Sequence, residues 1–204
     1  MSYEIPEKYL GGKGKEIINE DIRNMNYALN ASTASLDPST KVGACYVSKE
    51  GKILTLGCNK PSWDPDRFPW GNREDEIGRE NTKYPYVDHA EIVSALSYGG
   101  LLFDFIGSTL YVTLYPCPEC TKFLALLGVK KVVYLNKRLY GDVDESEVTM
   151  DKNNIEHINL KERLGIEKLE FNYMENEKNN IKVSSINNKK MTLRKYNTKN
   201  DSNE

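Results

Sequence analysis

Two short stretches of the chain contain the residue types that could do chemistry. The first, VDHAEIVSAL (residues 87–96), places His89, one of only two histidines, two residues before Glu91. The second, TLYPCPECTKF (residues 113–123), places Cys117 and Cys120 three apart behind a proline. Cysteines at this spacing can form a redox pair, a structural zinc clip or half of a catalytic zinc site.

The cysteine pair lies at the start of a predicted helix, residues 117–127, directly after Pro116. Residues three apart on a helix share a face, so both sulfur atoms can approach one ion. The free N–H groups and the positive dipole end of a helix start also favour thiolates. Metal binding and a redox pair fit these features about equally well, so the cysteines alone leave both interpretations open.

The remaining cysteines and histidine narrow the choice. Cys45 and Cys58 fall on predicted strands, where a free cysteine often packs as a small apolar residue. His157 lies in a polar stretch and is expected at the surface. His89 is therefore the natural third ligand. One histidine and two cysteines leave the fourth position of a tetrahedral zinc ion open, as in catalytic rather than structural sites.

Glu91 gives this arrangement a chemical role. Residues two apart diverge on a regular helix, so His89 and Glu91 can converge only near the helix start. Zinc lowers the pKa of a bound water toward neutrality, and an unligated carboxylate beside it can carry protons. The order H-x-E…P-C-x-x-C is the signature of zinc nucleobase deaminases. The chain satisfies each of its positions, with His89, Glu91, Pro116, Cys117 and Cys120.

The scaffold that must position these residues is predicted to be of the α/β class. Amphipathic spacing predicts a helix over residues 19–34, and Gly51 suits the turn of a hairpin between strands at 41–48 and 52–58. A strand at 109–114, the cysteine helix and a strand at 131–135 form a β-α-β unit, whose strands are parallel. The other expected elements are a helix at 88–97 and a last helix and strand within 154–173.

The chain is expected to divide into three parts. Residues 1–18 are predicted to be an N-terminal arm, residues 19–174 one compact domain, and residues 175–204, which are rich in Asn and Lys, a polar mobile tail. Within the tail, the short apolar pieces at 181–183 and 191–193 could still dock. The long connection at 61–86 contains several aromatic residues and is expected to be partly ordered near a site.

Composition argues against several classes of function. The mean hydropathy is −0.62 and no apolar run approaches the roughly 20 residues of a membrane span. The N-terminal residues have no secretion-signal pattern, so the four cysteines are expected in the reducing cytoplasm. The net charge of −2 and the isoelectric point of about 5.9 argue against polymeric nucleic acid as a partner.

The chain resembles the deoxycytidylate (dCMP) deaminase group of the cytidine deaminase-like superfamily. The resemblance covers roughly residues 19–173, and its best pieces are DPSTKVGA (37–44), TKYPYV (82–87), TLYVTLYPCPEC (109–120) and GVKKVVYL (128–135). It implies a three-layer α/β/α fold with a central mixed sheet of about five strands. It also implies hydrolysis of dCMP to dUMP with release of ammonia, a small nucleotide as substrate, and a homo-oligomer.

The resemblance also implies a role for each site residue. His89, Cys117 and Cys120 would bind Zn²⁺, and Glu91 would move protons. The backbone N–H of Ala90 would hold a ring oxygen, and Asn59 would touch the sugar. The sequence departs from the family pattern after Asn59, where Lys60 replaces the usual Gly, and at Asp88, where the family often has Cys.

Two questions stay open at this point. The same chemistry could act on another base, namely cytidine, guanine or tRNA adenosine, or the domain could be a catalytically inactive binding module. Glu91 argues against the module, because a zinc scaffold has no use for an unligated carboxylate. No single phosphate-binding cation can be chosen from the candidates, which are Lys41, Lys60, Arg67, Arg73 and Lys83.

Overall fold

The computed structural model describes residues 12–138, 144–171, 181–185 and 190–192. Its centre is a five-stranded mixed sheet in the order β2-β1-β5-β6-β7. The strands are β1 (Gly43–Val47), β2 (Ile53–Cys58), β5 (Thr109–Leu114), β6 (Lys131–Asn136) and β7 (Glu156–Asn159). Strand β1 is antiparallel to both β2 and β5, whereas β5, β6 and β7 are parallel. The predicted mixed sheet and its hairpin and β-α-β units are confirmed.

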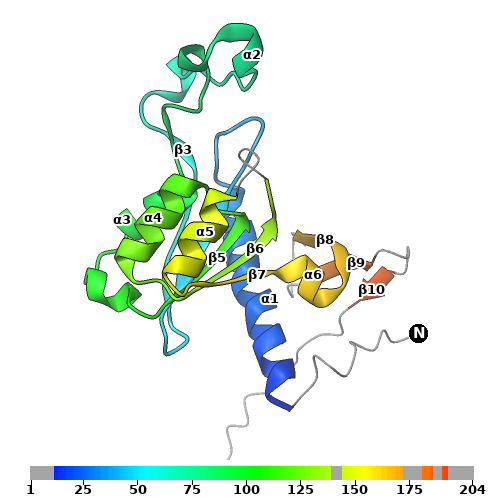
Figure 1. The fold of residues 1–204 in the computed structure, drawn as a ribbon. Helices are drawn as coiled ribbons and strands as arrows, with labels where there is room; N and C mark the ends of the chain where they lie inside the picture. Colours follow the sequence, from blue (N-terminus) through cyan, green and yellow to red (C-terminus); the bar gives the residue numbers. More distant parts are fainter. Residues whose placement is uncertain (1–11, 139–143, 172–180, 186–189, 193–204) are drawn as a thin grey trace, which may run out of the picture.

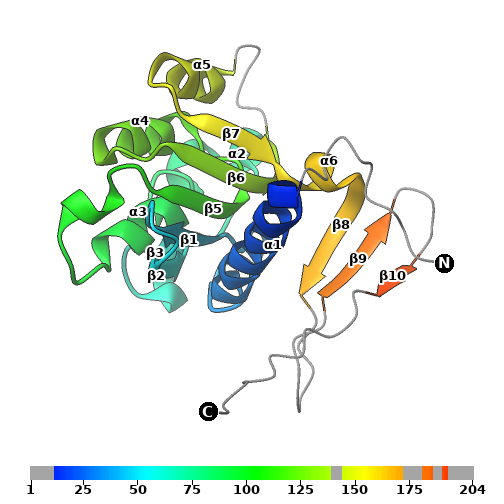
Figure 2. The same cartoon turned by 90° about the horizontal axis from the view of Figure 1, so that it is seen from below.

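Helices cover both faces of this sheet (Figures 1 and 2). One face carries α1 (Gly12–Ser32) and α6 (Leu160–Leu164), which pack on a core that includes Met25, Val47 and Leu160. The other face carries α3 (Ala90–Leu96), α4 (Pro118–Leu127) and α5 (Glu145–Lys152), over a second core that includes Tyr46 and Leu124. The architecture is therefore three-layered α/β/α, as predicted.

Two glycines meet backbone requirements of the sheet, one for a positive φ and one for a close approach. Gly51 has a φ of 83° in the β1–β2 turn, the positive value that was expected of it. Gly43, at the start of β1, faces α1, and a Cβ there would lie 1.9 Å from the carbonyl oxygen of Ala28. Only glycine allows β1 to pass this close to the helix.

The topology gathers several loops at one edge of the sheet. Because β1 runs against β2 and β5, its start lies beside their ends, with Gly43 opposite Cys58 and Ala44 opposite Val112. The loop before β1, the segment after β2 and the turn after β5 therefore meet at this edge. In open α/β sheets, ligands bind outside the carboxyl ends of the strands, so a binding site is expected at this edge.

The long connection between β2 and α3 stands away from the body of the molecule (Figure 1). Its base is a short antiparallel pair, β3 (Lys60–Pro61) with β4 (Val87–Asp88), and it contains η2 (Pro65–Arg67), α2 (Glu74–Ile77) and η3 (Arg79–Asn81). Aromatic rings hold it together. The ring of Trp63 lies 4.9 Å from that of Phe68 and 5.0 Å from that of Tyr86.

Several boundaries differ from the prediction. Helix α1 begins at Gly12, inside the predicted arm, whose residues 1–11 lie outside the described residues. Helix α3 begins at Ala90 rather than residue 88, and helix α5 was not predicted. Strands β8 (Ile166–Phe171), β9 (Ile181–Ser185) and β10 (Lys190–Thr192) form a separate antiparallel sheet. The division into arm, domain and tail stays a prediction, although β9 and β10 fall inside the expected tail.

The last helix and strand expected within 154–173 correspond to α6 and β8, preceded by β7. Within the described part of the chain, none of the helices is both long enough and apolar enough to span a membrane.

Candidate metal centre

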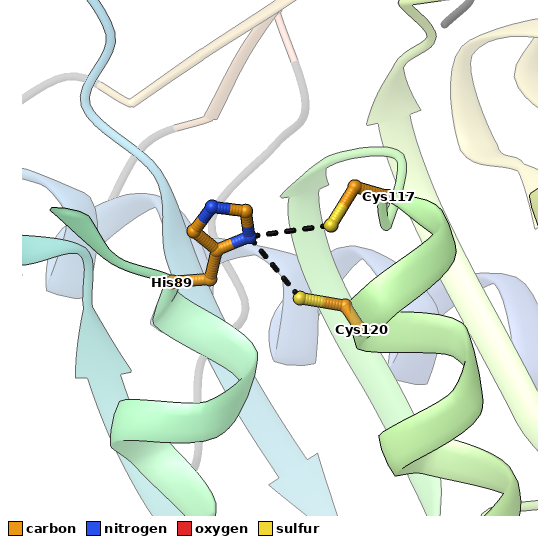
Figure 3. Close-up of side chains that lie close together, drawn as sticks. All are labelled: His89, Cys117 and Cys120. Carbon is orange, nitrogen blue, oxygen red and sulfur yellow. Dashed lines mark hydrogen bonds between the residues drawn. The ribbon is translucent and has the colours of Figure 1, made fainter. Parts of the chain in front are cut away.

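Three side chains from two helix starts converge at the loop-rich edge of the sheet. His89 is the residue directly before the first residue of α3, Cys117 is the residue directly before the first residue of α4, and Cys120 lies in the first turn of α4. The Nδ1 atom of His89 lies 3.3 Å from each of the two sulfur atoms. Figure 3 shows the three side chains pointing toward one another. We call these residues the metal-ligand group, because their ligand atoms all lie within 4.8 Å of one another.

The donor set and its spacing fit zinc. Zinc bonds of about 2.0 Å to nitrogen and about 2.3 Å to sulfur, at a tetrahedral angle, separate the two ligand atoms by about 3.5 Å. The observed separations of 3.3 Å between Nδ1 and each sulfur are close to this value. The sequence expectation that His89, Cys117 and Cys120 approach one point therefore agrees with the geometry.

The surroundings of the cysteine pair favour a negative charge on Cys117. A hydrogen bond from Cys120 and the neighbouring His89 lower the pKa of Cys117 to about 4, against the opposing effect of burial. The pKa of Cys120 moves upward, since it donates to Cys117 and is itself buried beside Glu91. The hydrogen bond to Cys117 raises the pKa of His89 to about 9. Cys117 is thus the first of the pair to become a thiolate, which is the form that binds metal.

Glu91 is buried directly beside this group. Burial raises the pKa of its carboxyl, in spite of the opposing charge of His89, and the carboxyl makes a hydrogen bond with the thiol of Cys120. Its own backbone carbonyl accepts a hydrogen bond of 3.0 Å from the hydroxyl of Tyr46. A raised pKa means that this buried carboxyl holds a proton more readily than a free one, which suits a group that must take and give protons as a general acid–base catalyst.

The helix boundary explains how His89 and Glu91 can face the same point. His89 has extended backbone angles (φ −76°, ψ 144°) and precedes the first helical residue, Ala90. Its side chain is therefore not bound by the spacing rule of a regular helix, under which residues two apart diverge. The N–H of Ala90 is one of the first four of the helix, which have no partner within the helix itself.

Asn59 lies at the same edge but is closely held. It is buried, and its Oδ1 accepts hydrogen bonds of 2.8 Å from both Ser35 Oγ and Val42 N. Its Nδ2 donates to Asp37 Oδ2 at 3.2 Å and to the Thr40 carbonyl at 3.0 Å. A side-chain amide has two donors and two acceptor positions, so all four are in use within the chain.

The candidate phosphate-binding cations fall into two groups. Arg67 and Arg73 pair with carboxylates within the projecting connection, and Lys83 is buried with its ammonium 2.6 Å from Asp37. Lys41 and Lys60 are exposed. Burial raises the pKa of the Cys58 thiol, and the positive charges of Lys41 and Lys60 act in the opposite direction. Only these two of the five candidates lack a carboxylate partner in the part of the chain that the structure describes.

Sequence reasoning missed the buried pair of Asp37 and Lys83. Its only signal was that each residue lies in a stretch, DPSTKVGA or TKYPYV, that carries the family resemblance. It also missed a second group of potential ligands on α5 and β7, formed by Glu147, Asp151 and His157. His157, which was expected at the surface, is half-buried and contacts Asp151 at 3.1 Å.

Comparison with known proteins gives consistent matches over this region. The model of the cytidine and deoxycytidylate deaminase zinc-binding region matches residues 18–136. The chain is 36% identical over 124 residues to human deoxycytidylate deaminase, covering 60% of this chain and 67% of the human protein. It is 35% identical over 135 residues to a probable deoxycytidylate deaminase of Drosophila melanogaster, covering 64% of this chain and 65% of that protein.

Among solved structures, the chain is similar to dCMP deaminase from the cyanophage S-TIM5, determined in complex with dCMP and dUMP. The TM-score is 0.50 at 28% sequence identity, and the match covers 74% of this chain and 98% of that one. The matched region of the family model contains the whole metal-ligand group and Glu91.

Proposed function

Because the chain belongs to the cytidine and deoxycytidylate deaminase family of zinc-binding proteins, we propose that it hydrolyses dCMP to dUMP and ammonia. The observation that carries the proposal is the buried carboxyl of Glu91 beside the metal-ligand group. Relatives named deoxycytidylate deaminase, and a solved relative that holds dCMP and dUMP, support the choice of nucleotide.

His89, Cys117 and Cys120 are proposed to hold the zinc ion, through Nδ1 and the two sulfur atoms. Zinc with three protein ligands keeps one position for water and lowers the pKa of that water toward neutrality. The protein's contribution is to supply thiolate at a helix start, where the free N–H groups and the dipole favour negative charge.

Glu91 is proposed to carry the protons of the reaction. Hydrolysis puts the oxygen of water on C4 of cytosine and breaks the bond between C4 and the exocyclic amino nitrogen. Protons must therefore pass from water to the ring nitrogen and to the departing ammonia. The carboxyl of Glu91 can take a proton on an oxygen atom and return it, and its burial keeps bulk water from exchanging that proton. Proton transfer by a positioned carboxyl typically contributes about 10²- to 10⁴-fold to the rate.

Two further residues are proposed to bind substrate. The N–H of Ala90, at the start of α3, would donate to the ring oxygen, because it has no partner within its own helix. Asn59 would border the sugar at the end of β2. Since its amide is fully bonded within the chain, it would take a sugar hydroxyl by exchanging one of its four hydrogen bonds.

An ammonia-release panel with the zinc-loaded protein tests the proposal. The substrates are dCMP, CMP, deoxycytidine, cytidine, guanine and a tRNA that carries the target adenosine. We expect the highest kcat/KM with dCMP. A preference for guanine or tRNA would shift the assignment to another base, whereas no ammonia from any substrate would favour a catalytically inactive binding module.

We also propose that the chain forms a homo-oligomer. Apolar side chains more than half exposed gather on η4 (Leu102–Phe105), its flanks and the neighbouring α4, namely Leu101, Leu102, Phe103, Ile106 and Leu126. Exposed apolar groups that lie together usually mark a protein–protein contact. Light scattering should give a multiple of 23.3 kDa, and Phe103→Glu with Leu126→Glu should reduce that mass. A native chain that is monomeric at assay concentration would contradict this.

The cytoplasm is the compartment that we propose. All four cysteines are free, and Cys117 and Cys120 bind metal only as reduced thiolates, which a reducing compartment preserves. Finding the chain in an oxidising compartment would contradict this assignment.

A further inference from the structure

Asp37 and Lys83 form a buried ion pair that holds the loop before β1, at the loop-rich edge of the sheet. Their side chains are 1% and 4% exposed, and the ammonium lies 2.6 Å from Asp37 Oδ2. The same ammonium donates to Ser39 Oγ at 2.8 Å, while Asp37 Oδ1 accepts from the backbone N–H groups of Ser39 and Thr40, both at 2.9 Å. Asp37 therefore folds the loop before β1 around its own carboxylate.

The pair also fixes the orientation of Asn59. Asp37 Oδ2 accepts from Asn59 Nδ2, which forces the amide oxygen of Asn59 to the opposite side. There it accepts from Ser35 Oγ and Val42 N, at the two ends of the same loop. The loop of residues 35–42, the end of β2 and Lys83 are thus joined in one hydrogen-bonded network.

The backbone of Lys83 links this network to the segment that ends in His89. Its N–H donates to the carbonyl of Gly71, and its carbonyl accepts from the N–H groups of Tyr86 and Val87, at 3.0 and 2.8 Å. Val87 belongs to β4, and His89 follows two residues later. One residue therefore connects the projecting connection, the loop before β1 and the segment that ends in His89.

Stability alone gives little reason for such a pair. Removing two charges from water costs several kcal/mol each, and replacing a buried ion pair with neutral groups is often neutral or stabilising. What an ion pair with many directed hydrogen bonds does supply is a single arrangement of the segments it joins. Here the segments that it joins contain Asn59, which is proposed to bind the sugar, and lead to His89, so a single arrangement has a use.

We propose that Asp37 and Lys83 are positioning residues for substrate binding, and that they act through Asn59 and the loop of residues 35–42. The proposal rests on the proposed function, because its effect is measured on nucleotide turnover. Neither side chain is required to touch the substrate. Their role is to hold Asn59 and the loop at a fixed distance from the start of α3.

The test is the double variant Asp37→Asn/Lys83→Met in the zinc-loaded full chain. The introduced amide can still accept from the backbone of the loop, but its NH₂ group faces the NH₂ group of Asn59, so Asn59 loses its fixed orientation. We expect KM for dCMP to rise by about tenfold or more, since misplacement of a binding group by an ångström can cost up to about 10²-fold. Zinc content should stay near the native value, because neither residue is a metal ligand, and the variant is assayed below its melting temperature.

Two comparisons make the result decisive. In a double-mutant cycle, Asn59→Ala should add little to the effect on KM that the Asp37/Lys83 variant already has, because both remove the same function. Glu20→Gln/Arg23→Gln, which removes an exposed ion pair of 3.2 Å on α1, should leave KM unchanged. A native KM in the Asp37/Lys83 variant, or an effect that simply adds to that of Asn59→Ala, would overturn the proposal.

Lys83→Arg provides a second route if the double variant does not fold. It keeps the positive charge, but the longer side chain must displace Asp37 in a buried site, so KM should still rise. A native KM in Lys83→Arg would then overturn the proposal. Failure of the native chain to release ammonia from any nucleotide would instead defeat the proposed function, so the two failures are distinguishable.

Discussion

Two regions of the molecule bring three potential metal ligands equally close together, and they differ in almost everything else. The metal-ligand group (His89, Cys117 and Cys120) lies at two helix starts. The carboxylate–histidine group (Glu147, Asp151 and His157) lies on α5 and β7. In each, all the ligand atoms lie within 4.8 Å of one another. Distance alone therefore does not separate a catalytic centre from a surface cluster.

Exposure and competing partners do separate them. In the carboxylate–histidine group, the side chain of Asp151 is 65% exposed, and Glu147 is held by the ammonium of Lys137 at 2.9 Å. One of these carboxylates is therefore already paired with a cation, and the other is largely open to solvent. In the metal-ligand group, the sulfur and nitrogen atoms face one another in a partly buried position, with the buried Glu91 beside them. Only there would binding a metal relieve groups that the fold has removed from water.

Metal removal should give the largest effect. Because the proposed mechanism needs a Lewis acid at the metal-ligand group, dialysis against a strong chelator should abolish ammonia release from dCMP, and added zinc should restore it. The measurement is initial rate against zinc added. Full activity in a preparation shown to be free of metal would break the distinction between the two regions.

Glu91→Gln should give the next largest effect. The amide fills the same space but cannot take up a proton, so kcat should fall by about 10²- to 10⁴-fold while zinc content stays native. Steady-state kinetics with parallel metal analysis measures both. Glu147→Gln is the matched control on the other region and should retain the native kcat. Near-native ammonia release from Glu91→Gln would refute its proton role.

The buried pair of Asp37 and Lys83 should also affect how the free energy of unfolding depends on pH. Burial acts to raise the pKa of Asp37, but Lys83 and the N–H groups of Ser39 and Thr40 outweigh it, so the pKa lies below its ordinary value. A carboxyl of this kind contributes stability that is fully present above its unfolded pKa of about 3.9 and is lost as pH falls through the folded value.

Lys83→Met should reverse the sign of the contribution that the Asp37 carboxyl makes to stability. Without the ammonium, the buried carboxyl of Asp37 has a pKa above the unfolded value and opposes folding at neutral pH. The variant should lose about 3 to 5 kcal/mol at pH 7, and its deficit against the native chain should shrink as pH falls. Denaturant melts of both proteins from pH 7 to the acid limit measure the deficit. A deficit that is constant with pH would show that the pair carries no net charge interaction.

The smallest effect is expected in the carboxylate–histidine group. Asp151→Asn/His157→Asn removes one partly exposed contact of 3.1 Å, which should change the free energy of unfolding by less than about 1 kcal/mol. Zinc content and kcat should be native. A loss of several kcal/mol, or a loss of metal, would mean that this group is more than a surface cluster.

Much of the fold was predictable because its signals are local. The strand at 109–114, the helix with Pro118 at its first position and the following strand were expected within a residue or two of their observed bounds. Helix α5 was missed because ESEVTMDK buries little beyond Met150, so its periodicity is weak. The start of α1 was missed because Gly12 and Gly14 have low helix propensity.

The site was predictable in its residues but not in its geometry. The spacing of the two motifs indicated His89, Glu91, Cys117 and Cys120, yet only the structure shows that His89 precedes its helix and so escapes the helical spacing rule. The pair of Asp37 and Lys83 joins residues 46 apart in sequence. No local pattern predicts such a contact, because it depends on where the segments before β1 and before β4 lie in space.

The most direct test of the account is the zinc content of three purified proteins. The native chain should hold about one zinc ion per chain, Cys117→Ser/Cys120→Ser should hold almost none, and Asp151→Asn/His157→Asn should hold as much as the native chain. Elemental analysis against protein concentration gives the ratio. Zinc that survives loss of the two cysteines, or that disappears with Asp151 and His157, would contradict the account.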